Sequence, residues 1–345
     1  MKILIIVPTG IPFDENSILT GGCGGSETWG VQLSNAFCEL GHEVMVIGLS
    51  APHYAQNGVQ YVPINEIDTI LRTRKFDLII ASRTYGNIVE VVENFKTSEN
   101  VFIQAHDTFV NGSNFNEIKK CNCFKGVSTL SAYQERTLHD ENGIEWSYMH
   151  RIGNGIDEKL FNGLDFTAKN KRLLWSSNFS RGGNIAEDHI VPAYIKKVAN
   201  GGIDFSGYSD IESKRGEHVK ILGSLSKPEL YKQMCDRYCW FYPSTFGETF
   251  CISLIENVMC ENDLILPLDY GPMSVLEPFY PDISMKYRFD KGEDEFKLAV
   301  DEATERIVES IKNHQAGQKL RAELKNYVLQ NYTWTAVAKK WLKLI

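Results

Sequence analysis

Short runs of aliphatic and β-branched residues alternate with longer segments of helical periodicity along this chain of 345 residues. Such alternation is typical of βαβ units, whose parallel sheets are buried by helices on both faces. The runs form two series, one in each half of the chain, and so predict two doubly wound α/β domains. The expected strands are 2–7, 43–47, 77–81, 101–105 and 125–128 in the first series, and 172–176, 219–222, 240–242 and 264–266 in the second.

A turn signal separates the two series. Asn154-Gly155 favours a break in regular structure, so we expect one domain over 1–155 and a second over 156–330. The last segment, about 331–345, carries Trp334 and Trp341 on one apolar helical stripe, with Thr333 as an expected N-cap. A helix with two tryptophans on one face needs covering, so we expect it to be docked.

The overall charge and the cysteines restrict the class of protein. The net charge of −8 argues against a general nucleic-acid binder, which would carry a basic excess. No apolar run approaches the ~20 residues that span a bilayer, and the run 2–7 is too short for a signal-peptide core. The eight cysteines form no pair of CxxC motifs, so we expect reduced thiols, no metal and a cytoplasmic location.

A glycine-rich loop precedes the first expected helix. It reads Gly21-Gly22-Cys23-Gly24-Gly25-Ser26-Glu27, and its end coincides with the start of the helix. Glycines allow close backbone approach, and a helix N-terminus attracts anions, so the loop predicts a phosphate cradle. The spacing is not GxGxxG directly after the strand, which disfavours a nicotinamide dinucleotide. The alternative is a flexible loop without a ligand.

Two glutamates in the second half, Glu248 and Glu256, lie eight positions apart. The pattern of the residues after Phe250 predicts a helix that starts near this residue, with Glu248 in the preceding loop and Glu256 about two turns into the helix. Paired carboxylates on a helix usually lie on a solvent-exposed face without a functional role. The surrounding residues are apolar or aromatic, which favours a site.

This segment resembles the E-x7-E motif of retaining glycosyltransferase family 4, whose GT-B fold has two Rossmann-like domains that face a central cleft. Other parts of the chain are similar to the family in the same order. These parts are the glycine loop with Ser26-Glu27, His106-Asp107 after an expected strand, the stretch 154–157, the stretch 176–182 that resembles the diphosphate-binding segment, and the C-terminal helix, which in the family crosses back onto the first domain.

The resemblance implies a role for each matching residue. The catalytic set is Glu248, His106 and Arg181: Glu248 hydrogen-bonds hydroxyls of the donor sugar, His106 lines the reaction centre, and Arg181 pairs with the diphosphate. The donor-binding set adds Gly24 and Gly25 near the phosphate or sugar, Asn178 beside Arg181, Glu256 on the ribose, and the amides near Thr249, Phe250 and Cys251.

The chain departs from the family pattern in three places. A first basic residue is expected near 176–178 but is absent, which leaves Arg181 as the cation of this segment. The stretch after Glu256 lacks the family's Gly and Pro, and Glu277 is only a loose match to a further family glutamate.

The implied function is retaining transfer of a hexose from a nucleotide-diphosphate sugar to an acceptor hydroxyl of a glycan. GDP-mannose is favoured as donor, from its frequency in the family, and UDP-glucose is next. The sequence holds no Asp-x-Asp metal motif, so no metal or other cofactor is expected. The alternatives are a sugar-nucleotide-binding protein without transferase activity and a sugar-nucleotide epimerase.

The charge of the first domain bears on the acceptor. Residues 1–155 carry 11 basic and 17 acidic side chains, 11 − 17 = −6. An anionic bilayer would repel such a domain. We therefore expect a neutral glycan, or a sugar attached to a protein, rather than a phospholipid. No nucleic acid and no stable membrane insertion are expected, and the oligomeric state stays open.

Overall fold

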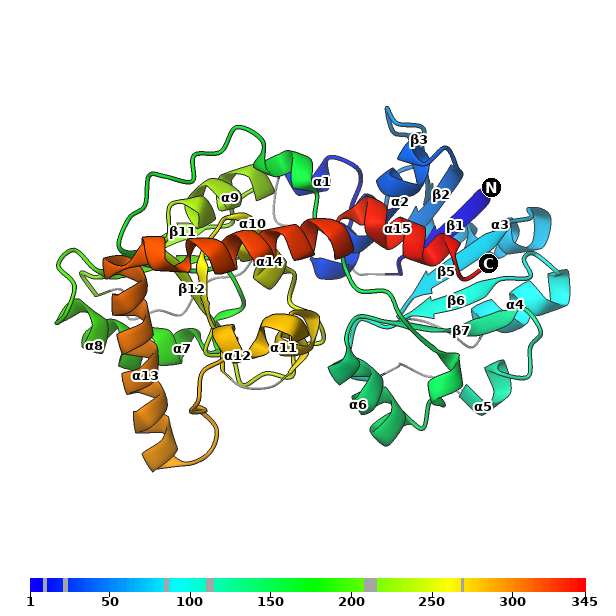
Figure 1. The fold of residues 1–345 in the computed structure, drawn as a ribbon. Coiled ribbons are helices and arrows are strands. Elements are labelled where there is room, and N and C mark those ends of the chain that lie inside the picture. Colours follow the sequence, from blue (N-terminus) through cyan, green and yellow to red (C-terminus); the bar gives the residue numbers. More distant parts are fainter. Residues whose placement is uncertain (9–10, 21–23, 84–86, 110–114, 208–215, 268–269) are drawn as a thin grey trace. The chain divides into compact units, whose positions relative to one another are not determined.

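The computed structural model describes residues 1–8, 11–20, 24–83, 87–109, 115–207, 216–267 and 270–345. The chain divides into two compact units. The described parts of 1–18, 24–155 and 332–345 form the first unit, and those of 19–20 and 156–331 form the second. Each unit is an α/β structure built on parallel strands, which confirms the predicted fold class (Figure 1).

The described residues of the first unit form one eight-stranded sheet. All neighbouring strands are parallel except the short edge pair β3–β4. The order across the sheet is β3 (His53–Tyr54), β4 (Gln60–Pro63), β2 (Glu43–Gly48), β1 (Lys2–Ile6), β5 (Leu78–Ser82), β6 (Val101–Gln104), β7 (Phe124–Thr129) and β8 (Met149–Arg151).

Helices cover both faces of this sheet, which explains why its central strands are apolar throughout. One face packs against α3 (Ile67–Thr73), α4 (Asn87–Phe95), α5 (Phe115–Ile118) and α6 (Ala132–Asn142) in a single buried core. The strands also contact α2 (Gly25–Glu39), which packs against α15 (Trp334–Leu342) from the end of the chain. The short helix α1 (Ser17–Thr20) precedes the glycine loop.

The C-terminal helix α15 is docked, as its tryptophans predict. Trp341 is fully buried, and its ring meets the edge of Phe102 in β6 at 5.6 Å between centroids. Thr333 is the N-cap, because its hydroxyl accepts a hydrogen bond from the amide of Ala336 at 3.2 Å. A Cβ on Gly155 would lie 2.6 Å from the ring of Trp334, so only glycine fits beside this helix.

The second unit contains two small parallel sheets. One has the order β11 (Val219–Gly223), β10 (Gly202–Ser206) and β9 (Arg172–Trp175), and the other pairs β12 (Cys239–Phe241) with β13 (Asp263–Ile265). The helices of this unit are α7 (Gly183–Ile185), α8 (Val191–Ile195), α9 (Lys227–Cys235), α10 (Ile252–Met259), α11 (Gly271–Val275), α12 (Tyr280–Ile283), α13 (Glu293–Lys312) and α14 (Gln318–Asn331).

Four strands are missing from the sequence prediction: β3, β4, β8 and β10. Of these, β10 is the central strand of its sheet, yet it contains Asp204 and begins at Gly202 after a second glycine. Asp204 is buried because it pairs with Arg172 and Arg237 at 2.7 and 2.8 Å, so a charged residue is satisfied inside the sheet. Local periodicity cannot reveal such a non-local pair.

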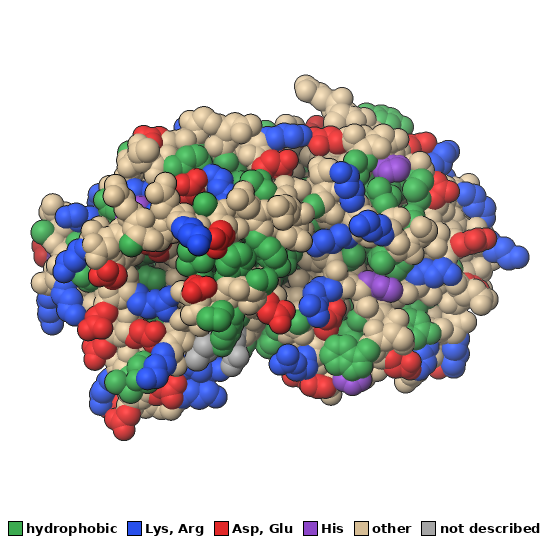
Figure 2. All heavy atoms as spheres, viewed as in Figure 1, with side chains coloured by type: hydrophobic (Ala, Val, Ile, Leu, Met, Phe, Trp, Pro, Cys, Tyr) green, Lys and Arg blue, Asp and Glu red, His purple; other side chains and the backbone are tan. Residues whose placement is uncertain are grey.

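The surface carries both signs of charge. On the face that Figure 2 shows, acidic and basic side chains are interspersed over both units. Among the described residues, no helix is both long enough and apolar enough to span a bilayer.

Candidate functional site

In the second unit, two loops at the carboxyl ends of neighbouring strands come together. The turn Phe179–Arg181 follows β9, and the loop that carries Glu248 follows β12. Nη1 of Arg181 lies 2.6 Å from Oε1 of Glu248, although the two residues are 67 positions apart. The structure therefore brings two of the predicted site residues into one ion pair, at the edge of a parallel sheet where α/β folds bind ligands.

The carboxylate of Glu248 has a second donor. The hydroxyl of Tyr242 donates to the same Oε1 at 2.7 Å, and the ring of Tyr242 stacks on Trp175 and Trp240 at 5.3 and 5.0 Å. Both hydrogen bonds fall on Oε1, and the side chain of Glu248 is only 12% exposed. The carboxylate is thus fixed in one orientation, with Oε2 left for another donor.

Arg181 is partly exposed and lies over the ring of Phe246 at 4.3 Å. Burial acts to lower the pKa of Arg181, but the negative charge of Glu248 beside it raises the pKa overall. One guanidinium nitrogen is used by Glu248, and the group has further N–H donors in its plane. Arg181 can therefore hold Glu248 and still offer donors to an anion.

Two glycines allow this close approach of loops. Gly182 follows Arg181 with φ of +117°, and a Cβ there would lie 3.0 Å from the carbonyl oxygen of Pro243. The amide of Gly271 donates to the carbonyl of Glu248 at 2.8 Å, and a Cβ there would lie 2.2 Å from this oxygen. Both contacts fix the backbone on either side of Glu248.

The helix after Glu248 begins at Ile252, two residues later than predicted. The shift has a backbone cause, because Cys251 has φ of +67° in the left-handed region and cannot continue a right-handed helix. Phe250 is buried at 1% exposure, which anchors the loop in the core. The predicted role of the amides of Thr249, Phe250 and Cys251 in binding sugar and phosphate stays a prediction.

Glu256 lies on α10 and is almost fully buried, at 1% exposure. Its Oε1 accepts hydrogen bonds from the hydroxyl of Tyr231, at 2.9 Å, and from the ammonium group of Lys227. Its Oε2 is buried and has no hydrogen-bond partner among the described residues. A buried carboxylate oxygen without a donor is costly, so the arrangement is suited to a ligand that supplies one.

The site residues that the sequence motifs predict do not include Lys227, Tyr231 or Tyr242. One signal for Lys227 was present: Ser226 and Glu229 form a capping box, which places Lys227 in the first turn of α9. Nothing local indicates that α9 faces Glu256.

Asn178 has a structural role in the turn that carries Arg181. Its Oδ1 accepts hydrogen bonds from the amide and the hydroxyl of Ser180, at 3.0 and 2.8 Å. The side chain thus caps the turn. Its predicted contact with the donor is a separate matter and stays a prediction.

In the first unit, the predicted phosphate cradle is described only in part, since 21–23 lie outside the described residues. Gly24 is the N-cap of α2, and a Cβ on it would lie 2.2 Å from Oε2 of the buried Glu27. A Cβ on Gly25 would meet no atom within 4 Å. In the described part of the helix start, the carboxylate of Glu27 therefore fills the space beside Gly24, whereas the space beside Gly25 is empty.

His106 follows the carboxyl end of β6, as predicted. It is 9% exposed, and its ring meets the ring of Trp29 in α2 at 5.2 Å between centroids. Burial, together with the charge of Arg83, lowers the pKa of His106 to about 3. Arg83 itself pairs with Asp107 at 2.8 Å. His106 is therefore a neutral imidazole at physiological pH and serves as a polar group without charge.

This pKa predicts a pH dependence of stability. His106 takes up a proton in the unfolded chain below pH ~6.5, but in the folded protein it does so only near pH 3. Its neutral form therefore contributes fully to the stability of the fold at pH 7, and this contribution is lost as the pH falls. Between pH 7 and 5, His106 should lower the free energy of unfolding by about 2 kcal/mol. Urea denaturation of the parent and His106→Gln at both pH values measures this, and equal losses in the two proteins would contradict it.

Among the described residues, no group of three or more His, Cys, Asp or Glu side chains is arranged to hold a metal ion. The described cysteines are free thiols, and Cys235 and Cys260 lie with their sulfur atoms 3.3 Å apart.

No protein-family model matches the sequence, and no curated protein matches it. Several solved structures match the fold over 99% of this chain. A glycosyltransferase from Rickettsia africae has a TM-score of 0.71 at 14% identity, with 97% of that chain covered. Sucrose-phosphate synthase from Thermosynechococcus elongatus has 0.70 at 15% identity, and HepE of Anabaena with UDP and glucose has 0.69 at 15% identity, each with 98% of its chain covered. The likeness confirms the predicted GT-B fold.

Proposed function

We propose that this protein is a glycosyltransferase that moves a hexose from a nucleotide-diphosphate sugar to a hydroxyl group of a glycan acceptor. Transfer occurs with retention at the anomeric carbon and without a metal ion. The observation that carries the proposal is the cluster of Glu248, Arg181 and Tyr242 at the carboxyl ends of β9 and β12. It combines a fixed carboxylate for sugar hydroxyls with a cation for a diphosphate.

Each group has a chemical task in this reaction. The diphosphate gains negative charge as the bond to the sugar breaks, and a guanidinium held in place stabilises that charge without reorganisation. Arg181 is such a group, because Glu248 and Phe246 hold it from two sides. Oε2 of Glu248 accepts a hydrogen bond from a donor-sugar hydroxyl, while Arg181 and Tyr242 keep Oε1 in position.

Glu256 takes part in nucleotide recognition. The unpartnered Oε2 of this buried carboxylate accepts hydrogen bonds from the ribose hydroxyls, while Lys227 and Tyr231 hold Oε1. Lys227 also supplies a positive charge to the second unit. This charge could compensate for the basic residue that is absent near 176–178. In the first unit, His106 contributes a neutral polar group to the acceptor side.

The same-face route suits these groups. We place no side chain in the role of covalent nucleophile, so the acceptor hydroxyl attacks from the side on which the diphosphate departs. The departing phosphate oxygen takes the acceptor proton. His106, with its pKa of about 3, is neutral near pH 7 and does not repel a developing positive charge on the sugar ring.

The donor is identified by binding. The sequence favours GDP-mannose and then UDP-glucose, whereas the similar structures include HepE of Anabaena in complex with UDP-glucose and a starch synthase of Arabidopsis thaliana bound to ADP. We therefore rank UDP-glucose first. Calorimetric titration with UDP-glucose, GDP-mannose and ADP-glucose tests this directly. Binding of none of the three would contradict the proposal, and tighter binding of GDP-mannose would reverse the ranking.

The absent basic residue favours one alternative, a protein that binds sugar nucleotides but does not transfer sugar. Weaker binding of the diphosphate would slow cleavage more than it weakens donor binding, because further negative charge develops on the diphosphate as the bond breaks. An epimerase on the same fold would change the configuration of the donor sugar. Release of free sugar and nucleoside diphosphate identifies a transferase, a changed sugar identifies an epimerase, and binding alone identifies a binding protein.

The acidic charge of the first domain predicts weak binding to anionic membranes. With 11 basic and 17 acidic side chains in residues 1–155, we expect little binding to anionic lipid, since each basic residue near a bilayer contributes only about 1 kcal/mol. Sedimentation with phosphatidylserine vesicles at low salt checks this, because screening is weakest there. The protein should stay in the supernatant. Strong co-sedimentation that fades as salt is added would instead indicate a lipid-linked acceptor.

A further inference from the structure

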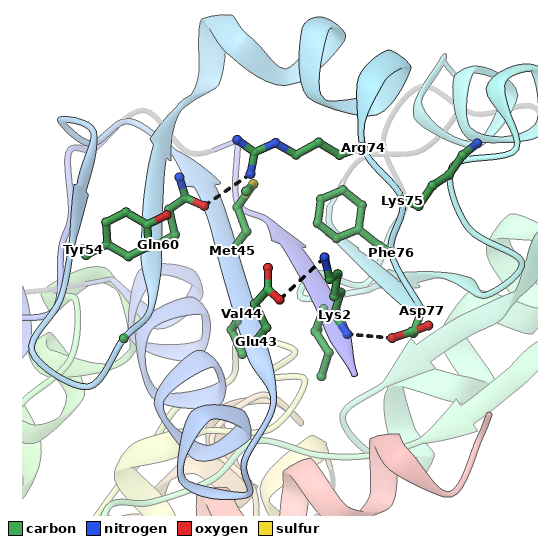
Figure 3. A pocket seen from close by; sticks show the side chains of 12 residues that line it. Lys2, Glu43, Val44, Met45, Tyr54, Gln60, Arg74, Lys75, Phe76 and Asp77 are labelled. Carbon is green, nitrogen blue, oxygen red and sulfur yellow. Dashed lines mark hydrogen bonds and ion pairs between the residues drawn. The ribbon is translucent and has the colours of Figure 1, made fainter.

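A pocket of about 770 Å³ lies within the first unit, at the amino edge of its sheet (Figure 3). Lys2, Glu43 and Gln60 line it, and they begin the parallel strands β1, β2 and β4. Gly24 and His106, in contrast, follow the carboxyl ends of β1 and β6. Parallel strands present all their amino ends at one edge, so this amino-edge pocket is separate from the groups on the acceptor side.

One wall of the amino-edge pocket carries planar polar side chains that make few hydrogen bonds within the protein. Tyr54 pairs with Gln60 across the β3–β4 ladder, is 70% exposed and has no side-chain hydrogen bond among the described residues. Nη1 of Arg74 reaches Oε1 of Gln60 at 3.4 Å, which is long for a hydrogen bond, and Arg74 has no carboxylate partner in the described parts of the chain. An aromatic ring, an amide and a guanidinium therefore face the space together.

The lysines of the pocket already have partners. Lys75 donates to the carbonyl oxygens of Phe95 and Lys96 at 2.7 and 2.6 Å. The ammonium group of Lys2 lies 3.8 Å from Oε2 of Glu43, and its amide donates to Asp77 at 2.7 Å. Neither Arg74 nor Lys75 has a carboxylate partner among the described residues, but backbone carbonyls hold the ammonium group of Lys75. The pocket therefore does not offer the convergent cations that a phosphate needs.

Apolar side chains form the rest of the pocket lining. Val44 and Met45 of β2, and Phe76 beside β5, line the pocket with side chains at most 9% exposed. A sugar ring has C–H faces that pack on an aromatic or apolar surface and hydroxyl groups that both donate and accept hydrogen bonds. Tyrosine combines an apolar ring with a polar end, and Gln60, Arg74 and Glu43 supply donors and acceptors.

We infer that the amino-edge pocket binds a neutral oligosaccharide. One sugar ring stacks on Tyr54, and its hydroxyl groups bond to Arg74, Gln60 and Glu43. The volume is within the range of small-ligand sites. The inference goes beyond the proposed transfer reaction, because it assigns a second carbohydrate site, on the first unit. It does not depend on catalysis, since Arg181, Glu248 and Glu256 belong to the other unit.

Ligand-observed saturation-transfer NMR tests the inference with maltotetraose, cellotetraose, mannotetraose and chitotetraose at millimolar concentration. At least one should bind, and Tyr54→Ala and Arg74→Ala should each weaken its binding about tenfold. Trp146→Ala is the matched control, because Trp146 is 51% exposed in the same unit but does not line this pocket. Melting temperatures of all variants should equal that of the parent, since the replaced side chains are exposed.

Two results would overturn the inference. These are no saturation transfer to any of the four tetrasaccharides, and unchanged binding in Tyr54→Ala, whatever the binding of Trp146→Ala. Displacement of the bound sugar by millimolar inorganic phosphate would also count against it, because it would show an anion site. Donor hydrolysis by Tyr54→Ala should match the parent, so failure of this inference and failure of the proposed function give different results.

Discussion

Replacement of Glu248 by glutamine should lower hexose transfer by roughly 100- to 1,000-fold, while binding of the nucleoside diphosphate persists. Glutamine keeps the shape but removes the charge that holds Arg181 at 2.6 Å and that, in the proposed reaction, binds a hydroxyl of the donor sugar. The diphosphate does not need Glu248. On the contrary, Arg181 is released from its ion pair, so we expect the affinity for nucleoside diphosphate to be equal or higher.

Steady-state transfer rates and calorimetric titrations of the parent and Glu248→Gln provide the measurement. Glu293→Gln is the matched control, since it removes a carboxylate that is 85% exposed on α13 in the same unit. Arg181→Ala gives the opposite pattern, with weaker binding of the nucleoside diphosphate and unchanged binding of the nucleoside. Turnover of Glu248→Gln within a few-fold of the parent would remove Glu248 from the reaction centre.

Replacement of Lys227 by methionine should destabilise the protein by about 3–5 kcal/mol at pH 7, because it leaves the buried charge of Glu256 without its cation. Urea denaturation of the parent and of Lys227→Met at pH 7 measures the loss, and equal stability of the two proteins would contradict the pairing.

The same variant should lose recognition of the ribose. In the parent, UDP should bind about 10- to 100-fold more tightly than 2′,3′-dideoxy-UDP, because in the proposed site the diol donates to the unpartnered Oε2 of Glu256. In Lys227→Met the difference should largely vanish, and Lys227→Arg should restore it. GDP and ADP with their dideoxy forms serve if UDP does not bind.

A merely structural role of Lys227 predicts another result. It would lower the affinities for UDP and for dideoxy-UDP by the same factor. The double variant Lys227→Met/Glu256→Gln separates the two cases further. If the pair acts as described, the double variant should be more stable at pH 7 than Lys227→Met alone.

The sequence predicts those parts of the fold whose cause is local. The strands at β1 and β2 are continuous aliphatic runs, and α2 begins at Gly25, directly after its glycine loop. The Thr333 cap and the burial of Trp341 also follow from adjacent residues. In contrast, β10 was not predicted, because the charge of Asp204 is balanced by arginines from distant segments.

The candidate site divides in the same way. Glu248, Glu256, Arg181 and His106 are marked by motifs in the sequence, but their partners are not. The contact of Arg181 with Glu248 spans 67 positions, and that of Lys227 with Glu256 spans 29. Tyr242 is an ordinary core aromatic by sequence, and only the folded loop shows that its hydroxyl holds a carboxylate. Such pairings arise from tertiary packing, which periodicity and spacing do not encode.

The most direct test of the proposed function is the cleavage of a nucleotide sugar by the purified protein. The protein is incubated with UDP-glucose, GDP-mannose or ADP-glucose in the presence of EDTA, and released nucleoside diphosphate and free hexose are measured over time. We predict slow, equimolar release from one donor, faster release when a neutral glycan acceptor is added, and loss of both in Glu248→Gln. Absence of cleavage with all three donors, with and without added Mg²⁺ or Mn²⁺, would contradict the assignment as a transferase.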